Sequence, residues 1–103
     1  MDRIAQLKEF LASSPEDPFL IHALALEYRK IEKYEDALTQ FLLNKEKNPD
    51  YVGTYYHLGQ LYEWMDKEDA AKEVYEIGME KAKVQEDQHA FNELRSVYEE
   101  LIF

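Results

Sequence analysis

The sequence has no cysteine, only three glycines and only three prolines in 103 residues. The absence of cysteine excludes a disulfide framework, a thiolate nucleophile and a cysteine-ligated zinc site. Because glycine and proline are scarce, long segments run without a helix breaker, which favours helices. No stretch approaches the roughly 20 apolar residues of a membrane span. The start at Met1 has no basic head followed by an apolar run, so we expect no signal peptide and a cytoplasmic location.

Basic residues are also few: 12 Lys and Arg stand against 22 Asp and Glu, a net charge of −10. Residues 1–50 hold 7 basic and 10 acidic residues, whereas residues 51–103 hold 5 and 12. This balance argues against nucleic acid as a partner. It fits either an acidic surface that keeps copies of the chain apart or a basic partner.

Apolar residues recur at helical spacing throughout the first half of the chain. Asp2 and Asp17 are predicted N-caps, because their carboxylates can accept from free backbone N–H groups of the first turn. Pro18 suits a first helical position, whereas Pro15 ends the preceding helix. The expected helices cover residues 2–12, 17–30 and 34–47.

The second half repeats this design. Asp50 and Asp66 are predicted to cap the fourth and fifth helices, and the fifth is expected to reach about Val84. The last helix is expected to begin near Asp87. Six helices joined by turns of a few residues pack as antiparallel neighbours, so the predicted fold class is all-α.

One pattern occurs twice between Ala23 and Ala82, and its two copies are 34 residues apart. A fixed period of this length is typical of stacked helical repeats. We expect the small residues of the pattern to lie where two helices approach closely, and the larger ones to fill the space between them. The first copy is Leu24, Ala25, Tyr28, Ala37 and Phe41, and the second is Leu58, Gly59, Tyr62, Ala71 and Tyr75.

The spacing Leu24-Ala25-x-x-Tyr28…Ala37-x-x-x-Phe41…Pro49 resembles a tetratricopeptide repeat, and the second copy resembles another. The resemblance is to a small stand-alone member of that family. It implies a right-handed α-α superhelix of antiparallel helix hairpins in a single domain. The implied parts are an N-terminal half-repeat helix at 1–14, repeats at 17–50 and 51–84, and a capping helix at 87–103.

Three positions, Ile21, Tyr55 and Asn44, depart from the family pattern. Ile21 and Tyr55 stand where the family favours tryptophan. In the second helix of each unit the family favours a small residue, which the second unit has as Gly78 and the first replaces with Asn44.

The last helix is also out of step with the period. Counting 34 residues from Leu58 reaches the polar Asn92, whereas two further residues reach Leu94. We therefore expect a longer fifth helix or a looser turn around residues 85–87, with Leu94 in the place of Leu58.

The first helix of each unit carries a second stripe of side chains beside its inward one. In the tetratricopeptide family these helices line a concave groove for a peptide or a partner helix, so the resemblance implies that the second stripe binds. Aromatic side chains beside isolated charges suit such a surface, although Phe19 and Leu26 can also pack under neighbouring helices. The candidate site residues are Phe19, His22, Leu26, Arg29, Lys30, Tyr56, Gln60, Glu63 and Trp64.

The groove is mixed in sign, because Arg29 and Lys30 suit a carboxylate and Glu63 suits a basic group. Some chaperone-binding members of the family hold a C-terminal carboxylate with lysines and asparagines. The matching places here hold His22, Leu26 and His57, so a heat-shock chaperone tail is not the expected ligand.

The sequence carries no catalytic signature. It has no H-E-x-x-H motif, glycine-rich phosphate loop or nucleophile elbow, so we predict no catalytic residue, no cofactor and no enzyme activity. The predicted function is a protein–protein interaction module that binds a peptide or helix in its concave groove.

Two alternatives remain open. One is homo-oligomeric self-association through the apolar tail Leu101-Ile102-Phe103, although we expect this tail to fold back over the last hairpin. The other, weaker alternative is a metal site formed by His22 and His57, because these histidines lie on adjacent first helices of the repeat.

Overall fold

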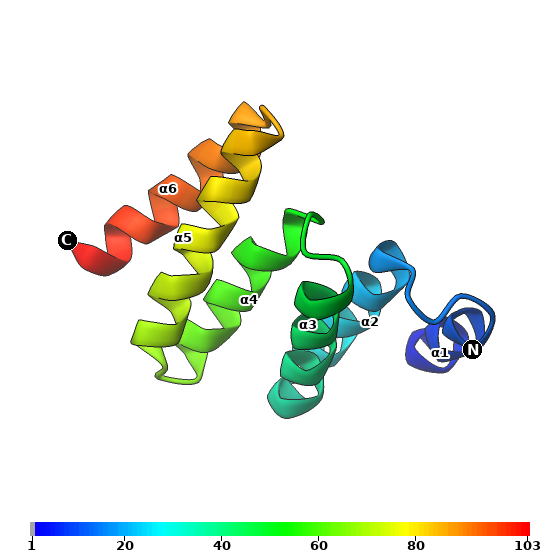
Figure 1. Ribbon diagram of the computed structural model, residues 1–103. Helices are drawn as coiled ribbons and strands as arrows, with labels where there is room; N and C mark the ends of the chain where they lie inside the picture. The colour runs from blue at the N-terminus through cyan, green and yellow to red at the C-terminus, as the bar shows by residue number, and fades with distance from the viewer. Residues whose placement is uncertain (1) are drawn as a thin grey trace. The chain divides into compact units, whose positions relative to one another are not determined.

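The computed structural model describes residues 2–103, and these residues form six helices (Figure 1). The helices are α1 (Arg3–Ser13), α2 (Pro18–Lys30), α3 (Tyr34–Lys47), α4 (Gly53–Trp64), α5 (Glu68–Val84) and α6 (Gln88–Ile102). Residues 2–103 contain no strand, so the predicted all-α class is confirmed. Within the same residues no helix is long and apolar enough to cross a membrane.

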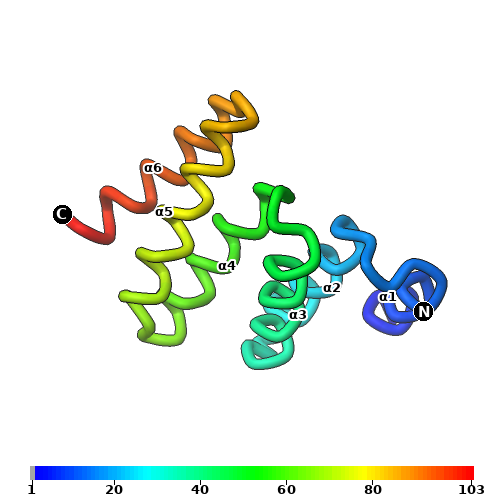
Figure 2. The backbone as a smooth tube through the Cα atoms, viewed as in Figure 1, coloured from blue at the N-terminus to red at the C-terminus, as the bar shows by residue number. Residues whose placement is uncertain are grey.

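The chain divides into two compact units, Met1–Tyr51 and Val52–Phe103, which we call unit 1 and unit 2. Unit 1 contains α1, α2 and α3, and unit 2 contains α4, α5 and α6. In each unit consecutive helices fold back on one another through short turns, as the backbone trace shows (Figure 2). The repeat boundaries expected from the sequence stay a prediction.

The core of unit 1 lies between α2 and its two neighbours. The small Ala25 on α2 and Ala37 on α3 are both completely buried, which lets the two helices of the hairpin approach closely. The apolar stripes on the inward sides of α1, α2 and α3 supply the rest of the core, as the repeat pattern predicts. The other buried apolar residues are Leu7, Ile21, Leu24, Tyr28 and Phe41.

Two of the predicted aspartate caps, Asp2 and Asp17, are correct, and Asp87, predicted only as the start of the last helix, is also a cap. The Asp2 carboxylate accepts from the backbone N–H of Ile4 at 3.2 Å, and that of Asp87 accepts from Ala90 at 3.0 Å. Asp17 caps α2 by accepting from two backbone N–H groups, those of Phe19 at 2.9 Å and Leu20 at 3.3 Å.

The caps predicted at Asp50 and Asp66 are wrong. Helix α4 begins at Gly53 after Val52, and α5 begins at Glu68 after Lys67, in both cases without a side-chain cap bond. Asp66 instead has a φ of 57° and serves the end of the preceding helix, where a left-handed residue lets the chain turn.

The turn at Asp66 is one of three with the same geometry. Glu32 and Glu86 also have positive φ, 61° and 57°. In each turn the next residue donates its N–H back to a carbonyl near the helix end: Lys33 to Tyr28, Lys67 to Tyr62 and Asp87 to Ala82, at 2.8–2.9 Å. The turn before α6 is therefore not looser than the others. The longer offset is accommodated by α5, which has 17 residues against 14 in α3, as expected for the longer fifth helix.

Unit 2 is packed around two glycines of its hairpin. A Cβ atom on Gly59 of α4 would lie 2.1 Å from the Tyr75 ring of α5, and one on Gly78 of α5 would lie 2.5 Å from the Cβ of Tyr55. Tyr55 and Tyr75 are among the largest fully buried side chains. Leu94 on α6 is also buried, in agreement with its predicted place.

The departures from the family pattern have a physical reason. The Cβ of Tyr55 and the Cδ1 of Leu94 lie so close to α5 that residue 78 has no room for a side chain. In unit 1 the smaller Ile21 stands in the place of Tyr55, and Asn44 stands in the place of Gly78. Asn44 is completely buried, donates its Nδ2 to the carbonyl of Pro18 at 3.0 Å and accepts from Asn48 at 2.8 Å. We infer that residue sizes are matched within each pair.

This matching can be tested with Gly78→Ala. The added methyl group meets the Cβ of Tyr55, which cannot move without the α4 backbone, so we expect a loss of about 1–3 kcal/mol in the free energy of unfolding. Urea denaturation followed by circular dichroism measures it. The control is Gly53→Ala, at an exposed residue of the first turn of α4 without positive φ, where alanine is expected to be neutral or to stabilise by about 0.5 kcal/mol. Equal stability of the two variants would contradict the size matching.

Candidate binding faces

The predicted site residues of unit 1 lie on α2, outside the stripe that forms the hairpin core. Phe19 is 64% exposed, so the alternative in which it packs under neighbouring helices is wrong. Leu26 and Arg29 are half-buried, and Lys30 is exposed and ion-paired with Glu27 at 3.3 Å. We call these residues the α2 face. Binding at this face stays a prediction.

His22 is a packing residue at the base of this face. Its ring makes edge contacts with Phe41, centroid to centroid 5.9 Å, and with Tyr51, 5.4 Å. Burial lowers the pKa of His22 below its ordinary value, because the desolvated imidazolium loses its hydration. Within residues 2–103 no group of three or more His, Asp or Glu side chains is placed to hold a metal ion, so the metal alternative gains no support.

The lowered pKa of His22 predicts a pH-dependent stability. As the pH falls below 6.5, the unfolded chain takes up a proton at residue 22 before the folded chain does, so the free energy of unfolding decreases. We expect His22→Gln to remove this part of the slope between about pH 7 and about pH 5. Urea titrations across that range measure it, with the exposed His89→Gln as control. A wild-type slope retained in His22→Gln would refute the prediction.

The predicted site residues of unit 2 lie on the outer side of α4. Trp64 is 53% exposed, and Tyr56, Gln60 and Glu63 are half-buried. The ring of Tyr56 packs edge-on against that of His57, 5.3 Å between centroids. As in unit 1, these side chains stand beside the inward stripe and not within it, and we call them the α4 face.

Glu63 is held by a buried tyrosine. The hydroxyl of Tyr75 donates to Oε2 of Glu63 at 2.5 Å, the length of a strong hydrogen bond to a carboxylate. Burial, together with this bond to Glu63, raises the pKa of Tyr75 far above its ordinary value, while a hydrogen bond from Gln60 opposes the shift. Tyr75 therefore stays protonated and acts as a donor, which orients the carboxylate.

This bond depends on Gly59. The Tyr75 ring lies so close to α4 that any side chain at residue 59 would collide with it. Glu63 is one helical turn further along α4, so the ring crosses Gly59 and its hydroxyl ends at Glu63. In unit 1 the equivalent residues are Ala25, Phe41 and Arg29, which cannot form such a bond because Phe41 has no hydroxyl.

Helix α6 contributes side chains that the sequence prediction missed. It contacts α4 as well as α5, and Tyr56 of α4 shares a hollow of about 350 Å³ with residues of α6. The signal was present, because the longer offset that aligns Leu94 with Leu58 also aligns groove positions of α4 with α6. The residues of α6 along this hollow are His89, Asn92, Glu93, Ser96 and Val97.

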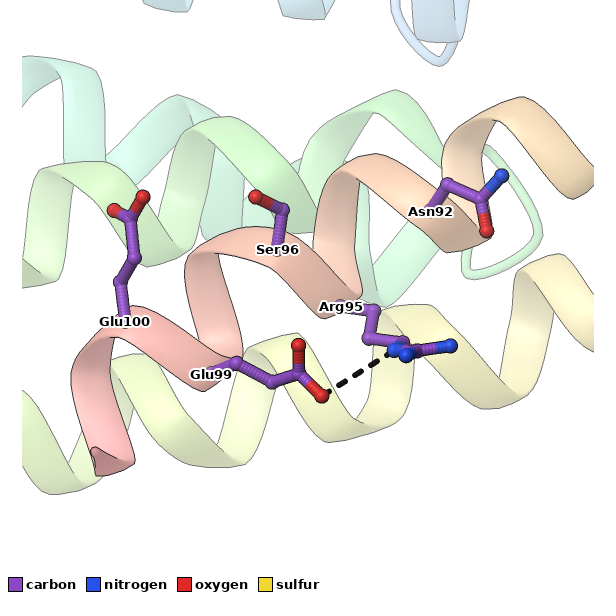
Figure 3. Close-up of a pocket in the computed structure, with 5 residues that line it drawn as sticks. All are labelled: Asn92, Arg95, Ser96, Glu99 and Glu100. Carbon is purple, nitrogen blue, oxygen red and sulfur yellow. Dashed lines mark hydrogen bonds and ion pairs between the residues drawn. The ribbon is translucent and has the colours of Figure 1, made fainter.

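The exposed side of α6 continues this surface toward the C-terminus. Asn92, Ser96 and Glu100 follow one another along the helix, and Arg95 is ion-paired with Glu99 at 3.3 Å (Figure 3). With the longer offset, Glu99 and Glu100 take the places that Glu63 and Trp64 have on α4. The expected capping helix is therefore also a continuation of the α4 face within unit 2.

The C-terminal tail does not fold back. Helix α6 continues to Ile102, and Phe103 is 94% exposed. The expectation that the tail folds back over the last hairpin is wrong, because the chain stays helical to Ile102 and leaves Ile102 and Phe103 exposed, while Leu101 is half-buried.

Similarity of this chain to known proteins is found among solved structures. No protein-family model and no curated protein matches the sequence. Among solved structures, a tetratricopeptide repeat domain protein from Salinibacter ruber is 44% identical, with a TM-score of 0.81 over 84% of this chain and 88% of that one. At this identity and coverage, the chain belongs to the tetratricopeptide repeat family.

Other solved structures share the fold at lower identity. The TPR2B domain of yeast Sti1, solved in a pHsp70 complex, is 17% identical with a TM-score of 0.88 over 95% of this chain and 78% of that one. The first tetratricopeptide domain of Spaghetti (RPAP3), bound to an HSP90 peptide, is 25% identical with a TM-score of 0.76 over 97% and 78%. These likenesses confirm the helical-repeat fold predicted from the period.

Proposed function

We propose that this chain is a non-enzymatic interaction module that binds a peptide or a helix of a partner protein through the α2 face and the α4 face. The observation that carries the proposal is that each of these first helices exposes a large aromatic side chain beside its buried stripe. Phe19 on α2 and Trp64 on α4 are both more than half exposed. Exposed aromatic side chains with charges nearby are the usual anchors of protein interfaces.

Membership of the tetratricopeptide repeat family supports this function. The solved Sti1 and Spaghetti domains hold pHsp70 and an HSP90 peptide, respectively, which favours a peptide as the class of ligand. The ligand proposed here is not a chaperone tail, because His22, Leu26 and His57 replace the lysines and asparagines that chaperone-binding relatives use.

The proposal can be tested with Phe19→Ala and Tyr56→Ala. Partners are captured from the host lysate with the wild-type chain, identified by mass spectrometry, and then titrated while the emission of Trp64, the only tryptophan, is followed. If both faces bind, each substitution is expected to weaken binding about tenfold or more, as truncation of an interface anchor does.

Circular dichroism spectra of both variants are recorded to check that they fold. The matched control is Lys72→Ala on the exposed outer side of α5, which is expected to bind as the wild type does. Capture of the same partners with unchanged affinity by Phe19→Ala and Tyr56→Ala would show that the α2 and α4 faces are not the binding surface.

Self-association is a second candidate, favoured by the 94% exposure of Phe103 at the end of α6. A second copy that covers this ring would remove apolar surface from water. We expect the mass measured by light scattering to rise with concentration in the wild type and to stay that of a monomer in Phe103→Asp. A monomer at every concentration in the wild type would remove this candidate.

A further inference from the structure

In unit 2, α4 and α6 contact one another, and both carry polar and aromatic side chains at the surface, which we call the α4–α6 face. Tyr56 of α4 and Glu93 of α6 line the same hollow, and the surface extends along both helices. Four of its side chains are carboxylates. The residues used below are Tyr56, Glu63, Trp64, Glu93, Glu99 and Glu100.

The charges of this face are only partly compensated. Glu99 is paired with Arg95 at 3.3 Å, and Glu93 lies 3.6 Å from Nε2 of His89, which attracts it only when protonated. In the part of the chain that the structure describes, no ion pair joins Glu63 or Glu100 to a cation. The face therefore carries negative charge that a ligand can neutralise.

Glu63 differs from the other carboxylates of this face, because a hydrogen bond from the Tyr75 hydroxyl orients its side chain. The Tyr75 hydroxyl engages Oε2, and a carboxylate has about four acceptor positions in all, so most of them remain for a ligand. A side chain that is already oriented loses less conformational freedom on binding.

The neighbour of Glu63 suits the same ligand. Trp64 is 53% exposed, and an indole is the best aromatic partner for a guanidinium or ammonium group. An arginine can bind a carboxylate through two parallel N–H groups while its plane stacks on an aromatic ring. Residue 63 thus offers a carboxylate and residue 64 an aromatic ring, the two kinds of group that basic side chains bind.

Unit 1 has the opposite chemistry at the equivalent positions. Arg29 and Lys30 stand where unit 2 has Glu63 and Trp64, and Phe41 stands where unit 2 has Tyr75. An attraction for cations is therefore a property of the α4–α6 face and not of the repeat in general.

We propose that the α4–α6 face binds a cationic segment of a partner protein, with an arginine side chain at Glu63 and Trp64 and further basic side chains toward Glu93 and Glu100. This inference rests on the proposed function and narrows the chemistry of its ligand. Charge complementarity selects this occupant, because the carboxylates without an ion partner and the exposed indole lie on the same face.

The test uses the full chain and a short peptide in which arginine alternates with leucine, with both ends blocked. Binding is followed by Trp64 emission and by anisotropy of a labelled peptide. We expect the arginine peptide to bind, the same peptide with glutamate for arginine not to bind, and the affinity to fall as salt is added. Glu63→Gln and Glu100→Gln are each expected to weaken binding roughly fivefold.

Glu80→Gln is the matched control, because it removes the same charge from the exposed outer side of α5 in the same unit. It is expected to leave the affinity unchanged. Tyr75→Phe keeps every charge but frees Glu63, so it is expected to weaken binding about twofold and to have no further effect in the Glu63→Gln background.

Equal binding of the glutamate peptide, or an equal loss in Glu80→Gln and Glu63→Gln, would overturn the cationic ligand. The outcome for the proposed function is separate. If the arginine peptide fails to bind while partners captured from lysate still depend on Tyr56, the interaction function holds and only the choice of a cationic segment is wrong.

Discussion

The packing of the Tyr75 ring against Gly59 is the constraint on which unit 2 depends. A Cβ atom at residue 59 would lie 2.1 Å from the ring, so the closest approach of α4 and α5 is possible only with glycine there. The same contact carries the Tyr75 hydroxyl across α4 to Glu63, where it donates a hydrogen bond of 2.5 Å. Core packing and the orientation of a surface carboxylate thus have one physical cause.

The repeat pattern constrains pairs of residues more strongly than single positions. Tyr55 with Gly78 and Ile21 with Asn44 are two solutions of the same packing problem, one with a large and an absent side chain, the other with two of medium size. The second solution buries an amide, which is tolerable because Asn44 donates to the carbonyl of Pro18. A single position can therefore depart from the family pattern when its partner changes with it.

The period of the sequence predicted the helices and their buried stripes, because both follow from local spacing. It failed at Asp66, since aspartate favours an N-cap and also tolerates the left-handed conformation that ends a helix. It failed at Asp50 because α4 begins at Gly53, so that Val52 and not Asp50 takes the cap position. The α6 side of the candidate face was missed for another reason. The longer offset, which aligns Leu94 with Leu58, was applied only to this core residue and not to the polar positions beside it.

The difference in charge between the α2 face and the α4 face begins in the core. A buried tyrosine hydroxyl needs an acceptor, and for Tyr75 the acceptor within reach is the carboxylate of Glu63 on the α4 face. Phe41, the equivalent residue of unit 1, has no hydroxyl that needs an acceptor, so the α2 face can carry Arg29 at the matching position. The Tyr75 hydroxyl thus favours a negative charge on the α4 face, and the absence of a hydroxyl from Phe41 permits a positive charge on the α2 face. In a repeat whose scaffold is fixed by small residues, buried aromatic positions can therefore select the sign of a binding surface without touching the ligand.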